Sequence, residues 1–188
     1  MNKITTIATL VAAATAMTAS AEQLVSVDLS VANQITISST GGASSADASF
    51  SAFTGFLLAD FYNTVGAGGG VVGGAGDLST FGEASDGSPS MFNSTTSFGL
   101  NIWSFTAGSP TIVSGEQAFS GSATFDVDAG VYAAMLAGNS SGEIYAGADS
   151  DDDITAGAIN IGTWALVPAP SSVAMLGLGG LVAGRRRR

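Results

Sequence analysis

The residues most able to do chemistry in this sequence form an acidic run, Asp149-Ser150-Asp151-Asp152-Asp153. Its first, third and fifth residues, Asp149, Asp151 and Asp153, are spaced like the opening ligands of a Ca²⁺ loop, because Ca²⁺ prefers oxygen ligands. An EF-hand would continue with Gly at position six and Glu at position twelve, which this chain lacks. The run therefore predicts either a looser Ca²⁺ site or a solvated acidic loop.

Two more carboxylates, Asp126 and Asp128, would complete such a site if the fold brings them near. Four carboxylates within the five residues 149–153 repel one another unless a cation is bound. Calcium is therefore the one cofactor that the sequence predicts.

Two other stretches match the consensus of catalytic or cofactor-binding motifs, but the sequence lacks the partner residues or the following helix that these motifs need. Gly138–Gly142 reads G-x-S-x-G, but that nucleophile needs a histidine base, and the chain has no His. Gly68–Gly73 reads G-x-G-x-x-G, but it lies in the glycine-rich stretch Val65–Asp77 and no amphipathic helix follows to hold a pyrophosphate. We interpret the first as a turn between strands and the second as part of a long loop. Residue types alone do not exclude a hydrolase that uses two carboxylates, but we expect that the protein is not an enzyme.

Charge limits the partners of this chain. Its five basic residues are Lys3 and Arg185, Arg186, Arg187 and Arg188, so all fifteen acidic residues lie in a stretch without a cation. Such a polyanion repels nucleic acid, and its fold cannot depend on ion pairs. The absence of Cys excludes disulfides, thiolate metal sites and cysteine nucleophiles.

Period-two patterning predicts strands in the central stretch. Apolar residues alternate with polar ones over Val25–Val31, Ile35–Ile37, Phe119–Val127 and Ile159–Thr163. The denser runs Phe50–Tyr62 and Phe98–Phe105 fit strands buried on both faces, although the first also fits a short helix. Trp103 and Trp164 lie in strand-like runs, so we expect them to pack in the core. Several short strands separated by turn residues predict an all-β domain, an antiparallel β-sandwich or jelly roll.

Both ends of the sequence look like processing segments. Residues 1–21 combine Lys3, an apolar stretch and an A-x-A site at Ala19 and Ala21, which predicts a signal peptide cleaved after Ala21. Val173–Gly184 is apolar and is followed at once by Arg185–Arg188, the order of a stop-transfer signal. Because a full span needs about 20 apolar residues, this short segment predicts a transient sorting element rather than a permanent anchor.

The tail resembles a PEP-CTERM sorting signal. It has Val167, Pro168, Ala169, Pro170 and Ser171, then a short apolar helix, then the Arg cluster, and Ala169 stands where the usual motif has Glu. The resemblance covers about the last 22 residues, 167–188. It implies a bacterial exported protein, cut near Pro168–Pro170 by an exosortase-type membrane protease. Similar tails also occur on some ice-binding proteins.

The sequence therefore predicts three segments: a signal peptide (1–21), an acidic β-rich ectodomain (22–166) and a sorting tail (167–188). We expect a helix in each of the two end segments. We expect the secretion machinery to export the protein and the tail to anchor it transiently in the inner membrane. The protein then reaches the cell surface or the extracellular matrix. A non-catalytic structural role is the first hypothesis, with extracellular polysaccharide as a partner. The alternative is a carbohydrate- or ice-binding module on the same tail.

Overall fold

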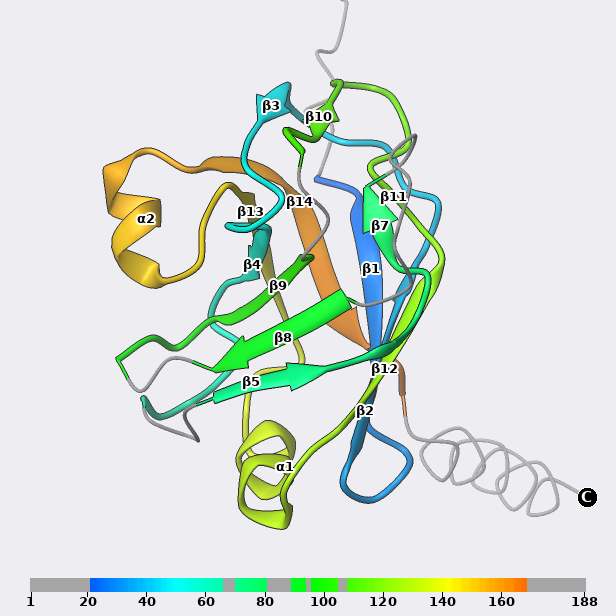
Figure 1. Cartoon of the computed structure of the whole chain (residues 1–188), viewed down its shortest axis with the longest axis vertical. Helices are drawn as coiled ribbons and strands as arrows, with labels where there is room; N and C mark the ends of the chain where they lie inside the picture. The colour runs from blue at the N-terminus through cyan, green and yellow to red at the C-terminus, as the bar shows by residue number, and fades with distance from the viewer. Residues whose placement is uncertain (1–20, 66–69, 81–88, 94–95, 105–107, 169–188) are drawn as a thin grey trace, which may run out of the picture.

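The structure is a computed structural model that describes residues 21–65, 70–80, 89–93, 96–104 and 108–168. The two expected end helices fall outside these residues. Within them, the fold is all-β, as predicted, and most of its strands form a single curved sheet (Figure 1).

The large sheet has ten strands in the order β5-β8-β9-β4-β13-β14-β1-β2-β12-β6. Their bounds are β1 Gln23–Asp28, β2 Gln34–Ser39, β4 Phe56–Leu58, β5 Gly70–Gly73, β6 Ala75–Gly76, β8 Pro89–Asn93, β9 Leu100–Ser104, β12 Ser122–Asp126, β13 Ser141–Ala146 and β14 Ile159–Leu166. Two short pairs accompany it: β3 (Ala48–Ser49) with β10 (Thr111–Ile112), and β7 (Ser79–Thr80) with β11 (Phe119–Ser120). The described pairs are antiparallel except β1 with β14, which run parallel.

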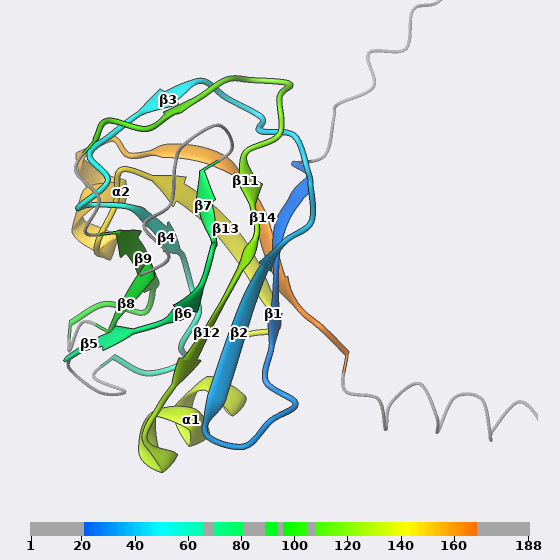
Figure 2. The same ribbon diagram turned by 45° about the vertical axis from the view of Figure 1, so that its right-hand side comes forward.

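The sheet curls until its two edges almost meet. The edge strands β5 and β6 are separated in sequence by Gly74 alone. A Cβ at this position would lie 2.5 Å from the Phe125 ring, so glycine lets the chain cross from one edge to the other over the packed core (Figure 2). The result is a nearly closed barrel whose walls face each other across one core.

Alternating burial explains why these segments form strands. In β2 and β12, Ile35, Ile37, Ala123 and Phe125 are buried, while the residues between them are partly exposed. Trp164 fills the centre of the core: its ring lies 5.0 Å from Phe61, and its Nε1 donates to the Ala59 carbonyl over 3.0 Å. Core packing was the expected role of this tryptophan, and it is confirmed.

Several predicted strands have different limits in the structure. β1 ends at Asp28, and Val31 is exposed in the following turn, where Asn33 has a φ of 60°. Of Phe50–Tyr62 only the three residues of β4 form a strand, and all three are buried, as expected for a strand covered on both faces.

Part of Val65–Asp77, predicted to be a loop, forms β5 and β6. This prediction was wrong because backbone hydrogen bonds to β8 and β12 outweigh the low strand preference of glycine.

Two short helices were not predicted. α1 (Ala129–Leu136) lies across the lower end of the barrel, where Met135 is buried and the Tyr132 hydroxyl donates to the Leu29 carbonyl over 2.6 Å (Figures 1 and 2). α2 (Asp151–Ala156) lies beside β13 and β14 at the other end. Each is too short to show a clear helical period in sequence.

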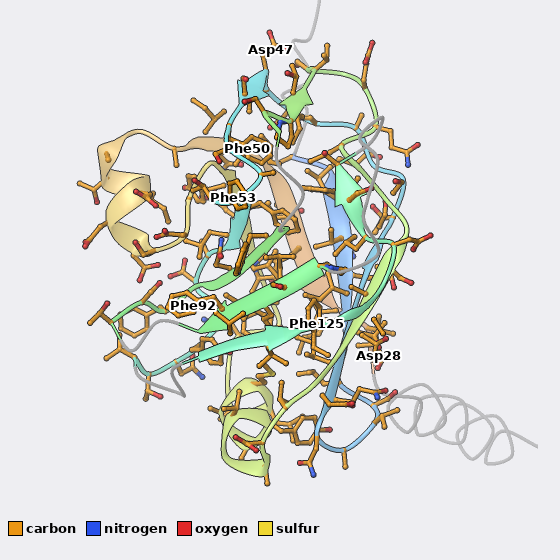
Figure 3. All side chains as sticks on the ribbon, in the orientation of Figure 1. Asp28, Asp47, Phe50, Phe53, Phe92 and Phe125 are labelled. Atoms are coloured by element: carbon orange, nitrogen blue, oxygen red, sulfur yellow. The ribbon has the colours of Figure 1, made fainter. Side chains whose placement is uncertain are left out.

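Carboxylates take over part of the role that ion pairs have in other proteins. Several accept hydrogen bonds from backbone N–H groups in turns, which fixes loop geometry without a cation. Figure 3 shows two of them, Asp28 and Asp47, at the periphery. In each pair the first residue's carboxylate accepts from the second residue's backbone N–H: Glu22 with Ala43 (2.8 Å), Asp28 with Ser30 (2.7 Å), Asp47 with Ser114 (2.8 Å) and Asp77 with Ser122 (3.0 Å).

We predict that Gly55→Ala destabilises the protein far more than Gly41→Ala. Both glycines have a positive φ, 69° and 78°, which costs a side chain about 1 kcal/mol. A Cβ at Gly55 would also lie 2.0 Å from the Ile102 carbonyl oxygen, whereas Gly41 has no neighbour within 4 Å. Urea unfolding should show losses of roughly 3 and 1 kcal/mol, respectively. Equal losses would contradict the close approach of this loop to β9.

Candidate functional site

The predicted processing points coincide with the ends of the folded body. Glu22, the residue after the expected signal cleavage, already accepts the Thr163 N–H through its carbonyl (3.0 Å). At the other end, the Val167 N–H donates to the Val27 carbonyl over 2.7 Å, and Pro168 is exposed. Ala21 is exposed as well. Because β1 and β14 are parallel, the chain enters and leaves the barrel at opposite ends (Figure 1).

The remaining residues of the processing signals lie outside the described residues. They are Ala19, Ala169, Pro170, Ser171, Arg185, Arg186, Arg187 and Arg188. Among the residues that the structure does describe, no helix combines the length and apolar character needed to cross a membrane.

The acidic run forms the start of α2 rather than a loop. Asp151, Asp152 and Asp153 occupy the first turn of the helix, where the partial positive charge of the helix N-terminus favours carboxylates. The Asp153 carboxylate accepts the Asp149 N–H over 2.9 Å, and the Asp151 carboxylate accepts the Phe98 N–H over 2.7 Å. These contacts give the run a structural role that needs no cation.

The structure does not gather the predicted calcium ligands. Asp126 lies at the end of β12 near α1, away from α2, and accepts a hydrogen bond from Gln34 Nε2 over 3.1 Å. In the described part of the chain, no group of three or more acidic residues is arranged to hold a metal ion. Calcium at Asp149, Asp151 and Asp153 stays a prediction.

The two stretches that match catalytic or cofactor-binding motifs do not lie in the secondary structure that those motifs need. Gly138–Gly142 connects α1 to β13, and not two strands as predicted, and the Ser140 carbonyl accepts the Leu166 N–H over 2.8 Å. The described part of Gly68–Gly73 is strand β5, with no helix after it. Neither motif has the strand–turn–helix geometry that its chemistry requires.

A pocket of about 360 Å³ lies between α2 and the loop that joins β3 to β4. Its other walls come from the end of β13 and the start of β14. The residues around it are Ser49, Phe50, Ser51, Thr54, Ala146, Gly147, Asp153, Ala156, Gly157, Ala158 and Ile159. Asp153 is thus a predicted site residue that borders a cavity of ligand size.

The pocket combines hydroxyls, one carboxylate, two large apolar side chains and three alanines. Ser49, Ser51 and Thr54 supply the hydroxyls, Asp153 the carboxylate, and Phe50 and Ile159 the apolar surface. Figure 3 places Phe50 on the side of the molecule that carries β3 and α2. Such a mixture suits an uncharged polar ligand that has some apolar surface of its own.

A buried amide holds two walls of the pocket together. Asn101 in β9 is 2 % exposed, and its Nδ2 lies 2.8 Å from the Thr54 carbonyl and 3.0 Å from the Ala148 carbonyl. A third contact, 3.3 Å, reaches the Phe56 carbonyl. The only sequence signal for this residue was an amide inside the apolar run Phe98–Phe105. The hydroxyls of Ser49 and Thr54 had no signal, because loop serines and threonines are common.

A second polar contact lies on the outer face of β13. The Tyr145 hydroxyl donates to the Glu143 carboxylate over 2.5 Å. This hydrogen bond, with smaller effects from burial and from the carboxylate charge, raises the pKa of Tyr145 above 10. The contact lies outside the pocket, so we assign it a role in the sheet surface rather than in binding.

Comparison with known proteins does not assign this chain to a family. No protein-family model, no curated protein and no solved structure matches this chain. The function must therefore be argued from the residues and the geometry above.

We predict that Asn101→Leu costs about 3 kcal/mol of unfolding free energy, because a side chain of similar size leaves buried carbonyls without a donor. Urea unfolding measures the loss. The control is Asn160→Leu on β14, where a partly exposed amide oxygen accepts the Gly162 N–H over 3.1 Å; water can replace this contact, so the loss should be about 1 kcal/mol or less. An Asn101 variant as stable as the wild type would show that the amide does not hold these walls.

We predict that the pKa of Tyr145 in the folded protein lies above the usual value for tyrosine, and that Tyr145→Phe removes this titration step. Since the folded pKa is raised, the stabilising contribution of Tyr145 is complete below pH 10 and is lost as the pH rises further. Tyrosinate absorbance against pH measures the step. Glu143→Gln should move it back toward 10, and an unchanged titration in that variant would contradict the hydrogen-bond origin of the shift.

Proposed function

We propose that this chain is an exported bacterial surface or extracellular-matrix protein, sorted and cleaved through its PEP-CTERM-like tail. Its ectodomain has a non-catalytic, structural role. The protein passes the secretion machinery, is held briefly in the inner membrane by the tail, and is cut by an exosortase-type protease.

The observation that carries this proposal is the match between the fold and the two processing points. The first sheet bond of the barrel involves Glu22 and the last involves Val167, so cleavage after Ala21 and near Pro168–Pro170 would remove no residue that pairs in the described sheet. A body held by backbone bonds and burial, with no cysteine, also needs no redox partner outside the cell.

The non-catalytic role is supported by the chemistry of the ectodomain. The stretch between the two signals has no His, Lys, Arg or Cys, so a charge-relay nucleophile or an activated thiol cannot form there. The carboxylates that remain serve in part as acceptors for loop amides.

A second candidate function is a binding module on the same tail, for carbohydrate or for ice. The pocket beside α2 favours carbohydrate. The outer face of β1, β2 and β12 carries rows of hydroxyls, including the pair Thr36 and Thr124, whose oxygens lie 2.9 Å apart. Because these two hydroxyls bond to each other, we give the pocket more weight than this face.

Intact mass of the protein in each cell fraction tests the proposal. We predict a chain that begins at Glu22, ends near Pro168–Pro170, and is found outside the inner membrane. Replacing Arg185–Arg188 with alanine should reduce the cleaved form, because the basic cluster holds the tail on the cytoplasmic side. A full-length chain that ends at Arg188 and stays in the membrane would refute sorting.

A further inference from the structure

The pocket beside α2 carries chemistry that the sorting role does not use. Its lining includes the hydroxyl-bearing residues and Asp153, together with Phe50 and the small residues Ala146, Gly147 and Ala156, and Gly147 lies next to Phe50. In the part of the chain that the structure describes, the side chains of Ser49 and Thr54 make no hydrogen bond, so both hydroxyls are available to a ligand.

We propose that this pocket binds a neutral sugar residue of a polysaccharide. A sugar ring presents hydroxyls that both donate and accept on its rim, and C–H groups on its faces. The carboxylate of Asp153 and the hydroxyls of Ser49 and Thr54 can bond the rim, while Phe50 offers an aromatic surface to a ring face. The volume of about 360 Å³ lies within the range of small-molecule pockets.

Charge decides which sugars fit. Asp153 borders the pocket, and Asp149, Asp151 and Asp152 lie within a few residues of it. No basic side chain exists between Glu22 and Pro168 to balance a carboxylate or sulfate on the ligand. An acidic sugar would therefore be repelled, whereas a neutral sugar can donate hydroxyl hydrogens to the Asp153 carboxylate.

The pocket is held in shape before any ligand arrives. Gly147 donates to the Gly55 carbonyl over 2.9 Å, and Asn101 joins the Thr54 and Ala148 backbones from below. Gly157 ends α2 with a φ of 108°, and the Ala158 N–H returns to the Asp153 carbonyl over 2.9 Å. Walls fixed in this way lower the entropy lost on binding.

That the sugar belongs to a surface or matrix polymer rests on the function proposed above. Sugar binding itself does not rest on it. The localisation experiment and the binding experiment can therefore fail separately: a protein that is not sorted can still bind a neutral glycan, and a sorted protein can fail to bind one.

Affinity electrophoresis of the full chain in native gels tests the proposal. The gels contain one polysaccharide each: a neutral glucan, galactan or mannan, or the acidic polymer alginate. We expect at least one neutral polymer to retard the protein and alginate to leave it unretarded. Failure of every neutral polymer, or retardation by alginate alone, would overturn the proposal.

A pair of neighbouring variants makes the test specific to the pocket. Asp153→Asn should weaken the retardation about tenfold, because it removes a charged acceptor yet keeps an oxygen for the Asp149 N–H. Asp152→Asn changes the same charge in the same turn without bordering the pocket, and it should bind as the wild type does. Equal effects of the two variants would mean that the polymer responds to overall charge and not to this site.

A third variant, Ser49→Ala, removes one hydroxyl without touching any acid, and it should also weaken binding. Unfolding midpoints equal to the wild type in all three variants separate lost binding from lost folding. A Ser49 variant that binds as well as the wild type, together with an unaffected Asp153 variant, would place the sugar elsewhere on the molecule.

Discussion

The parallel pairing of β1 with β14 is the constraint on which the rest of the structure depends. β14 lies between β13 and β1, so the last described strand joins the first strand to the other half of the sheet. The barrel cannot close until residues 159–166 are available, and Glu22 and Val167, near the two ends of the described residues, then take part in backbone hydrogen bonds. A fold completed by its last described strand forms only once that strand is present, since loop closure over the whole domain comes last.

The absence of basic side chains between Glu22 and Leu166 sets the second condition. With no Lys, Arg or His in this stretch, its stability must come from buried apolar area and from the sheet ladder. The structure meets this condition with a tryptophan-centred core and with carboxylates that accept loop amides. The same negative charge would oppose an anionic ligand, which is why we propose a neutral sugar for the pocket.

Sequence reasoning predicted the all-β class and the alternating strands β2 and β12, because burial on one face of a strand leaves a period-two pattern. It missed β5 and β6, where glycine carries no side-chain signal and pairing alone decides. It also missed α1 and α2, which are too short for a helical period. The charge of the acidic run 149–153 is evident in the sequence. Its position at the start of a helix beside a pocket could not be predicted, because it depends on β13 and β14. Asn101, which joins the pocket walls, showed in sequence only as an amide within an apolar run, and its partners Thr54 and Ala148 could not be known before the fold.

The central claim is that the folded body is complete between the two processing points. Comparing the urea unfolding of the full chain with that of a chain from Glu22 to Pro168 tests it most directly. The account predicts the same midpoint for both chains, because every described sheet bond lies between these residues. A shorter chain that unfolds at a clearly lower urea concentration would show that the end segments belong to the fold, which would contradict their role as removable signals.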